Sequence, residues 1–320
     1  MVRRTAYGAP MKPIGSIDET PAGGLANPPR KARILSAAIL RILRIVGLVA
    51  GGTLVVLYFL QDRIIFPGAA TQGRPESRVF PRNGAELVEI KPPGGDRIMA
   101  VFGPALARDG HPLDHPESRP ALIYFYGNAM CLAYSDQEFD RFRRLGLNVL
   151  IPDYLGYGMS EGNASELGCR LTAEACFDHL RSRGFPAQRI IAAGWSLGGA
   201  VAIDLAARRQ LGGLIAFSTF TSARDMGKTF FPLALPRWFF AHRFESLRKI
   251  GSIGCPILLG HGRRDSLIPF SMFEQLLAAT NPAASRIIID QADHNDFYDV
   301  GGKTLFEAIS RFLEETQHRR

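Results

Sequence analysis

The residues with the clearest chemical potential are Gly194, Ser196 and Gly198, which form a Gly-x-Ser-x-Gly turn. An apolar run, RIIAAGW, leads up to the serine, and a helical pattern starts directly after it at Leu197. This order predicts a strand, a sharp turn and a helix, with the serine at the carboxyl edge of a sheet, where such folds bind ligands. The flanking glycines keep Cβ atoms out of a tight turn in which the serine is strained. The pattern therefore indicates a nucleophile at a helix N-terminus, whose free N–H groups stabilise an oxyanion.

A serine hydroxyl is a poor nucleophile at neutral pH unless a neighbouring base takes its proton. Two downstream loops supply the missing groups. Asp265 follows the apolar run PILLGHG, and His294 follows the next run, SRIIID. In folds that place a nucleophilic serine on such a turn between a strand and a helix, the catalytic residues follow the chain order serine, acid, histidine. We therefore predict that His294 takes the serine proton and that Asp265 holds the imidazole tautomer and stabilises its protonated form.

Other histidines and acids fit these roles less well. His261 lies just before Asp265 on the same loop and is interpreted as a strand-end residue. Asp293 and Asp296 stand too close to His294 in the chain to orient its ring easily. The residues interpreted as structural on their position alone are His111, His115, His179, His242, His318 and Asp290.

Acyl transfer also needs two hydrogen-bond donors for the oxyanion. The first is the backbone N–H of Leu197, directly after the nucleophile. The second is expected in the loop that follows ALIYFYG, where the backbone N–H of Asn128 is the prediction and that of Ala129 the alternative. This chemistry needs neither a metal ion nor an organic cofactor, and the sequence predicts none.

Strands and helices alternate along most of the chain. Apolar runs bounded by turn residues are AELVEI, RIMAVFG, ALIYFYG, LNVLIPD, RIIAAGW, GGLIAFS, PILLGHG and SRIIID. Helical patterns cover residues 135–145, 165–183, 197–210, 270–280 and 302–317. Strands that alternate with helices of this length predict an α/β fold, with a mostly parallel central sheet covered by helices on both faces. The first two runs leave no room for a helix between them, which predicts an antiparallel start.

An apolar segment precedes this pattern. From Ile45 to Leu60 no residue is charged, and as a helix these sixteen residues reach about 24 Å. The hydrocarbon core of a bilayer is about 30 Å thick, so a span must also use the preceding ILRIL, with Arg41 and Arg44 extending to the headgroups. The sequence predicts a transmembrane anchor. An amphipathic surface helix and a cleaved signal peptide are the alternatives.

The charge of the chain is concentrated near this segment. The formal net charge is +8, and residues 1–63 hold nine Lys and Arg against three Asp and Glu, which leaves +2 for the rest. This distribution argues against a nucleic-acid-binding protein. Five basic residues on the immediate N-terminal flank of the apolar segment, between residues 30 and 44, favour a cytoplasmic N-terminus. We therefore expect a single-pass membrane protein with its catalytic domain outside the cytoplasm, in the periplasm if the source is bacterial.

Several quoted segments together resemble one superfamily. Residues 121–130, DYLGYGMSEGNASELG, GWSLGGAVAIDLA, RRDSLIP and DHNDF are similar to the α/β-hydrolase superfamily, and within it to the membrane-anchored BEM46-like group, which includes the human α/β-hydrolase domain proteins 12, 13 and 17. QDRIIFPG resembles the segment that follows the membrane helix in that group. The resemblance implies an α/β-hydrolase fold, a serine-hydrolase mechanism and a preference for acyl esters or thioesters, often lipidic.

One position departs from the family pattern. Where the family usually has His-Gly-Asn, this chain has Tyr126-Gly127-Asn128. The family histidine supports the oxyanion loop, so the tyrosine is interpreted as altering that support rather than abolishing catalysis. Tyr126 is also a candidate substrate-binding residue.

The domain boundaries follow from these patterns. Residues 1–33 are predicted to be a disordered basic N-terminus, 34–60 the transmembrane anchor, and 61–320 the α/β-hydrolase domain, with a short cap insertion at about 221–250. The cap is dense in aromatic residues, which either line an acyl channel, contact a bilayer or pack as an ordinary core. Its candidate substrate-binding residues are Phe231, Trp238 and Phe239.

The function predicted from the sequence is a membrane-anchored serine hydrolase that cleaves carboxylic ester or thioester bonds of acyl or lipid substrates through an acyl-enzyme. A serine peptidase or amidase of the same fold, and a non-catalytic membrane-tethered binding protein, are the alternatives.

Overall fold

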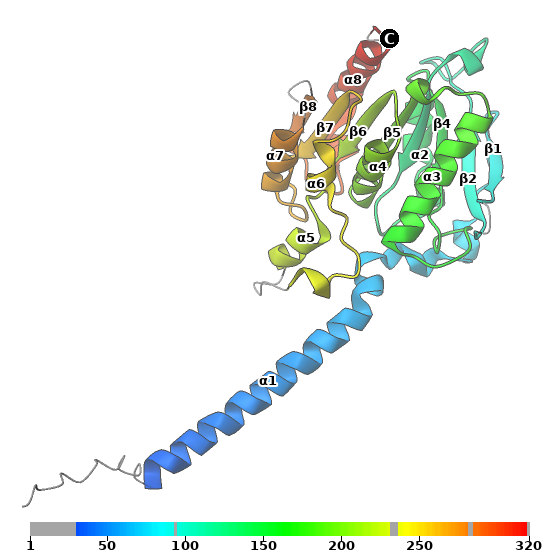
Figure 1. Cartoon of the computed structure of the whole chain (residues 1–320). Coiled ribbons are helices and arrows are strands. Elements are labelled where there is room, and N and C mark those ends of the chain that lie inside the picture. The colour runs from blue at the N-terminus through cyan, green and yellow to red at the C-terminus, as the bar shows by residue number, and fades with distance from the viewer. Residues whose placement is uncertain (1–29, 93–94, 231–235, 281–283, 319–320) are drawn as a thin grey trace, which may run out of the picture. The chain divides into compact units, whose positions relative to one another are not determined.

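The computed structural model describes residues 30–92, 95–230, 236–280 and 284–318 (Figure 1). By their internal contacts the residues divide into two units, 1–54 and 55–320. Of the N-terminal segment predicted to be disordered, residues 1–29 lie outside the described residues, as does Phe231 of the cap.

One eight-stranded sheet forms the centre of the second unit. Its strands follow the order β1-β2-β4-β3-β5-β6-β7-β8. Their bounds are β1 Glu86–Ile90, β2 Ile98–Gly103, β3 Ala121–Phe125, β4 Asn148–Pro152, β5 Ile190–Trp195, β6 Gly213–Phe217, β7 Ile257–Gly262 and β8 Ser285–Ile289. The pairs β1–β2 and β2–β4 are antiparallel, and every later pair is parallel. The antiparallel start and the mostly parallel sheet are confirmed.

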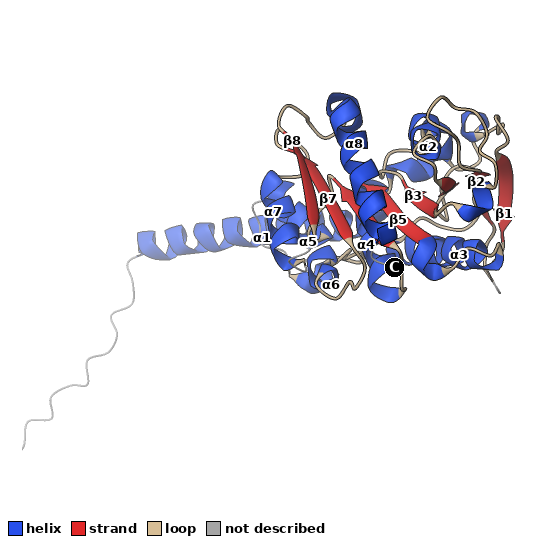
Figure 2. Ribbon diagram, turned by 90° about the horizontal axis from the view of Figure 1, so that it is seen from above, coloured by secondary structure: helices blue, strands red, loops and turns tan. Residues whose placement is uncertain are grey.

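Helices cover both faces of this sheet. Their bounds are α2 Asp136–Arg143, α3 Glu166–Ser182, α4 Leu197–Arg208, α5 Ala223–Phe230, α6 Ser246–Ile250, α7 Phe270–Ala279 and α8 Phe297–His318. In Figure 2, α2 and α8 lie on one side of the sheet, and α3, α4 and α6 on the other. The central strands are therefore buried on both faces: every residue of β3, β4 and β6 is buried, as their continuous apolar runs predict.

Two helices differ from their predicted bounds. The last was expected from residue 302, but α8 begins at Phe297 and bends at Gly302, whose backbone leaves the helical region (φ 40°, ψ −131°). The N-terminal helix α1 spans Arg30–Ile65, past the expected end of the anchor at residue 60. Within it, Ala38–Ile65 is long and apolar enough to cross a membrane. Asp62 and Arg63 marked the end of the apolar run in the sequence, but charge alone does not end a helix.

Candidate active site

The predicted nucleophile lies on a sharp turn between β5 and α4. Ser196 is the single residue between Trp195, which ends the strand, and Leu197, which begins the helix. Its backbone has φ 58° and ψ −120°, a conformation that residues with a Cβ seldom adopt. Two hydrogen bonds hold the Ser196 backbone: its N–H donates to the Phe217 carbonyl at 2.9 Å, and its carbonyl accepts from the Thr219 hydroxyl at 2.9 Å.

The neighbouring glycines are required by close backbone approach. A Cβ at Gly194 would overlap the carbonyl of Gly198, and a Cβ at Gly198 would overlap the carbonyl of Phe125. Strand β5 and the first turn of α4 therefore pack directly on backbone atoms, with no space for side chains. Within the turn, the Ser196 hydroxyl lies within hydrogen-bonding distance of His294, and the Trp195 ring packs against the imidazole with centroids 4.9 Å apart.

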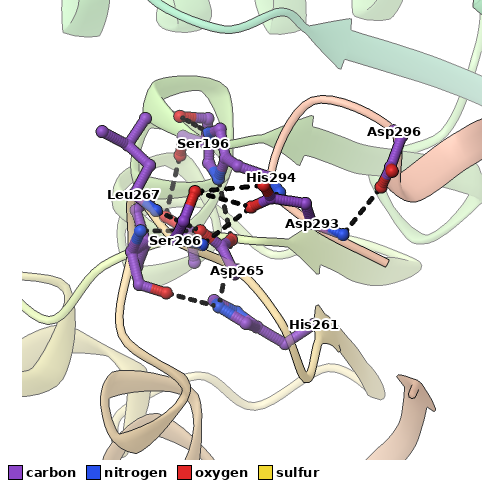
Figure 3. A network of polar contacts seen from close by, with 10 residues as sticks. Ser196, His261, Asp265, Ser266, Leu267, Asp293, His294 and Asp296 are labelled. Carbon is purple, nitrogen blue, oxygen red and sulfur yellow. Dashed lines mark hydrogen bonds and ion pairs between the residues drawn. The ribbon is translucent and has the colours of Figure 1, made fainter. Parts of the chain in front are cut away.

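Three loops at the carboxyl ends of β5, β7 and β8 bring the predicted triad together (Figure 3). The Ser196 hydroxyl lies 3.0 Å from Nε2 of His294, and Nδ1 of His294 lies 2.8 Å from Oδ2 of Asp265. All three residues are buried. With a proton on Nδ1, the imidazole donates to the carboxylate and accepts from the serine hydroxyl. This is the arrangement in which a histidine can remove the serine proton.

The Asp265 carboxylate is held by four donors. Oδ1 accepts the N–H groups of Leu267 (3.0 Å) and Ile268 (2.7 Å), and Oδ2 lies 2.8 Å from His294 and 3.2 Å from Nε2 of His261. Burial by itself would raise the pKa of Asp265, but the hydrogen bonds from His261, His294 and Ile268, together with the charge on His294, hold that pKa well below its usual range. The acid therefore stays ionised and keeps the histidine tautomer fixed.

His261 is a site residue that the sequence interpretation missed. It ends β7 as expected, but its buried imidazole turns back toward Asp265, and its Nε2 also lies 3.0 Å from the Ile268 carbonyl (Figure 3). The available signal was a histidine four residues before the acid, across the tight turn that follows a strand.

Asp293 connects the histidine loop to the acid loop. Its Oδ1 accepts from the N–H of Ser266 at 2.7 Å and from the N–H of His294 at 2.6 Å, and the Asp296 carboxylate accepts the N–H of Asp293. The N–H groups of Ser266 and His294 lower the pKa of Asp293. Neither Asp293 nor Asp296 contacts the His294 ring, in keeping with the sequence interpretation. They fix the loop instead.

An apolar cavity of about 290 Å³ opens beside the serine. Ser196, Leu197 and Asn128 line it, so the residues that carry the two predicted oxyanion donors face the same space as the nucleophile. Phe239 of the cap lines it, together with Phe230, Phe240 and Phe244, and its role in substrate binding stays a prediction. Trp238 does not: it is 76% exposed. Leu57, Gln61, Ile64 and Ile65 of α1 were not predicted to line a pocket, and they do.

Tyr126 lies outside this cavity, which corrects its prediction as a substrate-binding residue. It is fully buried, and its hydroxyl donates to Oδ1 of Asp153 at 2.9 Å. The Tyr154 hydroxyl donates to the Tyr126 carbonyl, and the N–H of Leu132 donates to the same Oδ1 of Asp153. Burial raises the pKa of Asp153, although the hydrogen bonds from Tyr126 and Leu132 lower it in part. The tyrosine thus supports the loop that carries Asn128 from the buried side of that loop.

Within the described part of the chain, no group of three or more His, Cys, Asp or Glu side chains could hold a metal ion.

Sequence comparisons identify the family. A family model described as the alpha/beta hydrolase family matches residues 125–274. Protein bem46 of Schizosaccharomyces pombe is 31% identical over 296 residues, which cover 88% of this chain and 96% of that protein. The chain belongs to the α/β-hydrolase family, in its BEM46-like group. An uncharacterized protein of Mycobacterium tuberculosis is 31% identical over 87% of this chain and 95% of its own length. An uncharacterized membrane protein of Saccharomyces cerevisiae is 30% identical over 84% and 95%.

Solved structures agree on the fold of this α/β-hydrolase. The Pyrococcus furiosus esterase Pf2001 superposes with a TM-score of 0.58 at 20% identity, over 72% of this chain and 92% of that one. The 2,6-dihydroxy-pseudo-oxynicotine hydrolase superposes with a TM-score of 0.58 at 20% identity, over 72% and 68%. At these identities the likeness shows the fold alone, and hydrolase activity is what the family supports.

Proposed function

We propose that this α/β-hydrolase is a membrane-anchored serine esterase or thioesterase that cleaves acyl substrates through an acyl-enzyme. The observation that carries the proposal is the hydrogen-bonded chain from Ser196 through His294 to Asp265, at 3.0 and 2.8 Å, which opens into an apolar cavity. An activated serine beside apolar walls suits a substrate whose reacting carbonyl carries a hydrocarbon chain.

The first step forms the acyl-enzyme. The Ser196 oxygen attacks the carbonyl carbon while its proton moves to Nε2 of His294. The N–H groups of Leu197 and Asn128 stabilise the negative oxygen of the tetrahedral intermediate. His294 then donates the proton to the departing alcohol or thiol as the bond from carbon to the leaving group breaks. Asp265 stays ionised throughout and stabilises the imidazolium.

The second step returns the serine. Water attacks the acyl carbon and gives one proton to His294, the carbon–Oγ bond breaks, and His294 passes the proton back to Ser196. The carboxylic acid leaves. The cavity of about 290 Å³ lies near the lower end of the volume range of small-molecule sites, and most of the side chains that line it are apolar. Medium-length to long acyl chains are therefore the expected substrates.

The test is the hydrolysis of p-nitrophenyl esters of increasing acyl length by the full chain in detergent, together with fluorophosphonate labelling. Ser196→Ala is expected to abolish both activities, whereas Ser310→Ala, a serine change on α8 that the cavity does not include, should retain them. Hydrolysis of peptides in place of esters would favour the amidase alternative. A wild-type protein that neither labels nor hydrolyses any substrate would refute the proposal and leave the binding-protein alternative.

The proposal places the catalytic domain outside the cytoplasm. Five basic residues lie between residues 30 and 44, directly before the apolar segment, the helix from Ala38 to Ile65 is long enough to span, and a yeast relative is called a membrane protein. A C-terminal tag should be digested by protease added to intact cells or spheroplasts. A tag that stays protected until lysis would contradict this orientation, and a mature protein lacking the helix would indicate the cleaved-signal alternative.

A further inference from the structure

The last turns of α1 form part of the wall of the catalytic cavity. Leu57, Gln61 and Ile64 line it at spacings of four and three residues, which places them on one face of the helix. Leu57 is half-buried, while its neighbour Val56 is 56% exposed and does not line the cavity. These turns belong to the same compact unit as the sheet, which begins at residue 55. The end of the candidate span is thus also a part of the site.

Gln61 joins this helix to the aromatic cap. Its buried side-chain amide donates to the Phe239 carbonyl at 3.0 Å, and its amide oxygen accepts the N–H of Ala241 at 3.0 Å. The two bonds satisfy consecutive backbone groups of the segment that carries Phe239 and Phe240 into the cavity. A glutamine placed in this way fixes one wall of the cavity against the other.

Two further contacts support the same junction. Oδ1 of Asp62 lies 2.7 Å from Nε2 of His242, and the ring of Tyr58 packs edge-on against that of Phe239, with centroids 6.0 Å apart. Asp62 and Arg63 are the first charged residues after the apolar run, and charged groups stay out of the hydrocarbon layer. Leu57 precedes Asp62 by five residues, about 7.5 Å along the helix, and so lies on the hydrocarbon side of that boundary.

The cavity opens beside this helix. Ile64 lines it and is nevertheless 55% exposed, which marks an edge of the opening. Phe230, which also lines the cavity, is exposed, and so are Phe59 and Trp238 (76% each). Tryptophan is enriched at the interface between membrane and water, and exposed apolar side chains of this size are typical of surfaces that contact a membrane or a partner.

We propose that the C-terminal turns of the membrane helix are the acyl-binding wall of the active site, and that the substrate is a lipid ester whose chain enters from the bilayer along Leu57 and Ile64. The helix then selects acyl length as well as holding the enzyme at the membrane. This inference rests on the proposed function, because it assigns the chain-binding site of the Ser196 reaction.

The first experiment compares Leu57→Trp with Val56→Trp in the reconstituted full chain. A tryptophan at Leu57 fills the cavity, and each buried methylene displaced costs about fourfold in kcat/KM. The ratio of kcat/KM for dodecanoyl over butyryl p-nitrophenyl esters should therefore fall at least tenfold in Leu57→Trp and stay within about twofold of wild type in Val56→Trp. Leu57→Ala, which enlarges the cavity, should shift the optimum toward longer chains and guards against a Leu57→Trp protein that fails to fold.

The second experiment tests how the substrate arrives. A dipalmitoyl glycerol ester, which exchanges slowly between bilayers, is placed either in the same phosphatidylcholine vesicles as the enzyme or in a separate vesicle population. Turnover is expected only in the shared bilayer. Equal turnover in both arrangements, or equal chain-length ratios in the two tryptophan variants, would overturn the inference. In either case two measurements on the wild type report separately on the proposed function, which fails if fluorophosphonate labelling of Ser196 is absent or if peptides are hydrolysed in place of esters.

Discussion

Replacing Ser196 with glycine should give a more stable protein than replacing it with alanine. Both changes remove the hydroxyl and its 3.0 Å contact with His294, so the difference between them isolates the backbone. The backbone conformation at position 196, with φ 58° and ψ −120°, is readily adopted by glycine and is strained for any residue with a Cβ. Alanine keeps the strain and glycine releases it.

The size of the difference follows from two opposing free energies. A residue held in such a region stores about 1–3 kcal/mol, which glycine recovers. Glycine also increases the conformational entropy of the unfolded chain, which costs about 0.5–1 kcal/mol. The net advantage of Ser196→Gly over Ser196→Ala is therefore about 1 kcal/mol. In a domain of this size that corresponds to about 2–4 °C in Tm.

The assay is thermal and urea unfolding of both variants in the same detergent, with Ser310 of α8 as the matched control. At Ser310, inside a helix, alanine should be the more stable replacement by about 1 kcal/mol, because glycine is a poor helix former. The order of the two variants is thus expected to reverse between the sites. If Ser196→Ala proves as stable as Ser196→Gly, the serine is not strained and the reasoning is wrong.

Three further changes test other parts of the site. Gly198→Ala should slow fluorophosphonate labelling about a hundredfold, because its Cβ would overlap the Phe125 carbonyl and displace the first turn of α4 with its oxyanion donor. Because the pKa of Asp265 is lowered in the folded state, the unfolded chain binds more protons than the folded chain below about pH 4. The free energy of unfolding of the wild type, measured with urea, should therefore fall from pH 5 to 3, and Asp265→Asn should lessen that fall. Gln61→Ala should lower the free energy of local opening of the cap by about 2–4 kcal/mol, and so speed hydrogen exchange at residues 239–241 while the sheet stays protected. Equal acceleration of exchange in the cap and in the sheet would contradict this expectation.

The sheet and the meeting of three loops could be predicted because both follow from short-range patterns. Alternating apolar runs and helices define a parallel sheet, and parallel strands bring their carboxyl ends to one edge. Ser196, Asp265 and His294 each follow such a strand, so chain order alone was enough to place them near one another. The need for Gly194 is equally local, because its Cβ would meet the backbone of Gly198, whereas Gly198 is required by the carbonyl of Phe125 on strand β3.

The cavity walls were not predictable in this way. Gln61 and Phe239 are 178 residues apart, and no periodicity shows that an amide at the end of an apolar helix pairs with the cap backbone. In the cap, the choice between Trp238, which is exposed, and Phe239, which is buried, depends on which side of a short 3-10 turn faces the helix. His261 was underestimated for a similar reason, since the direction of its ring depends on packing against Phe270 and Phe273.

Hydrogen bonds on two sides hold the loop that carries Asn128. From behind, the Tyr126 hydroxyl reaches Asp153, whose carboxylate also receives the N–H of Leu132. From the other side, the Asn128 carbonyl accepts the N–H of Gly68 at 2.9 Å, and its side-chain amide lies 3.3 Å from the carbonyl of Ile65 at the end of α1.

The C-terminal end of α1 therefore contacts the loop proposed to carry the second oxyanion donor, just as its preceding turns line the cavity. On this side Asn128 is held through its own carbonyl and its side-chain amide, and these hydrogen bonds do not involve the residue at position 126. We therefore expect that loss of the contacts between Asn128 and the end of α1 would displace the proposed oxyanion donor more than a change at Tyr126 would.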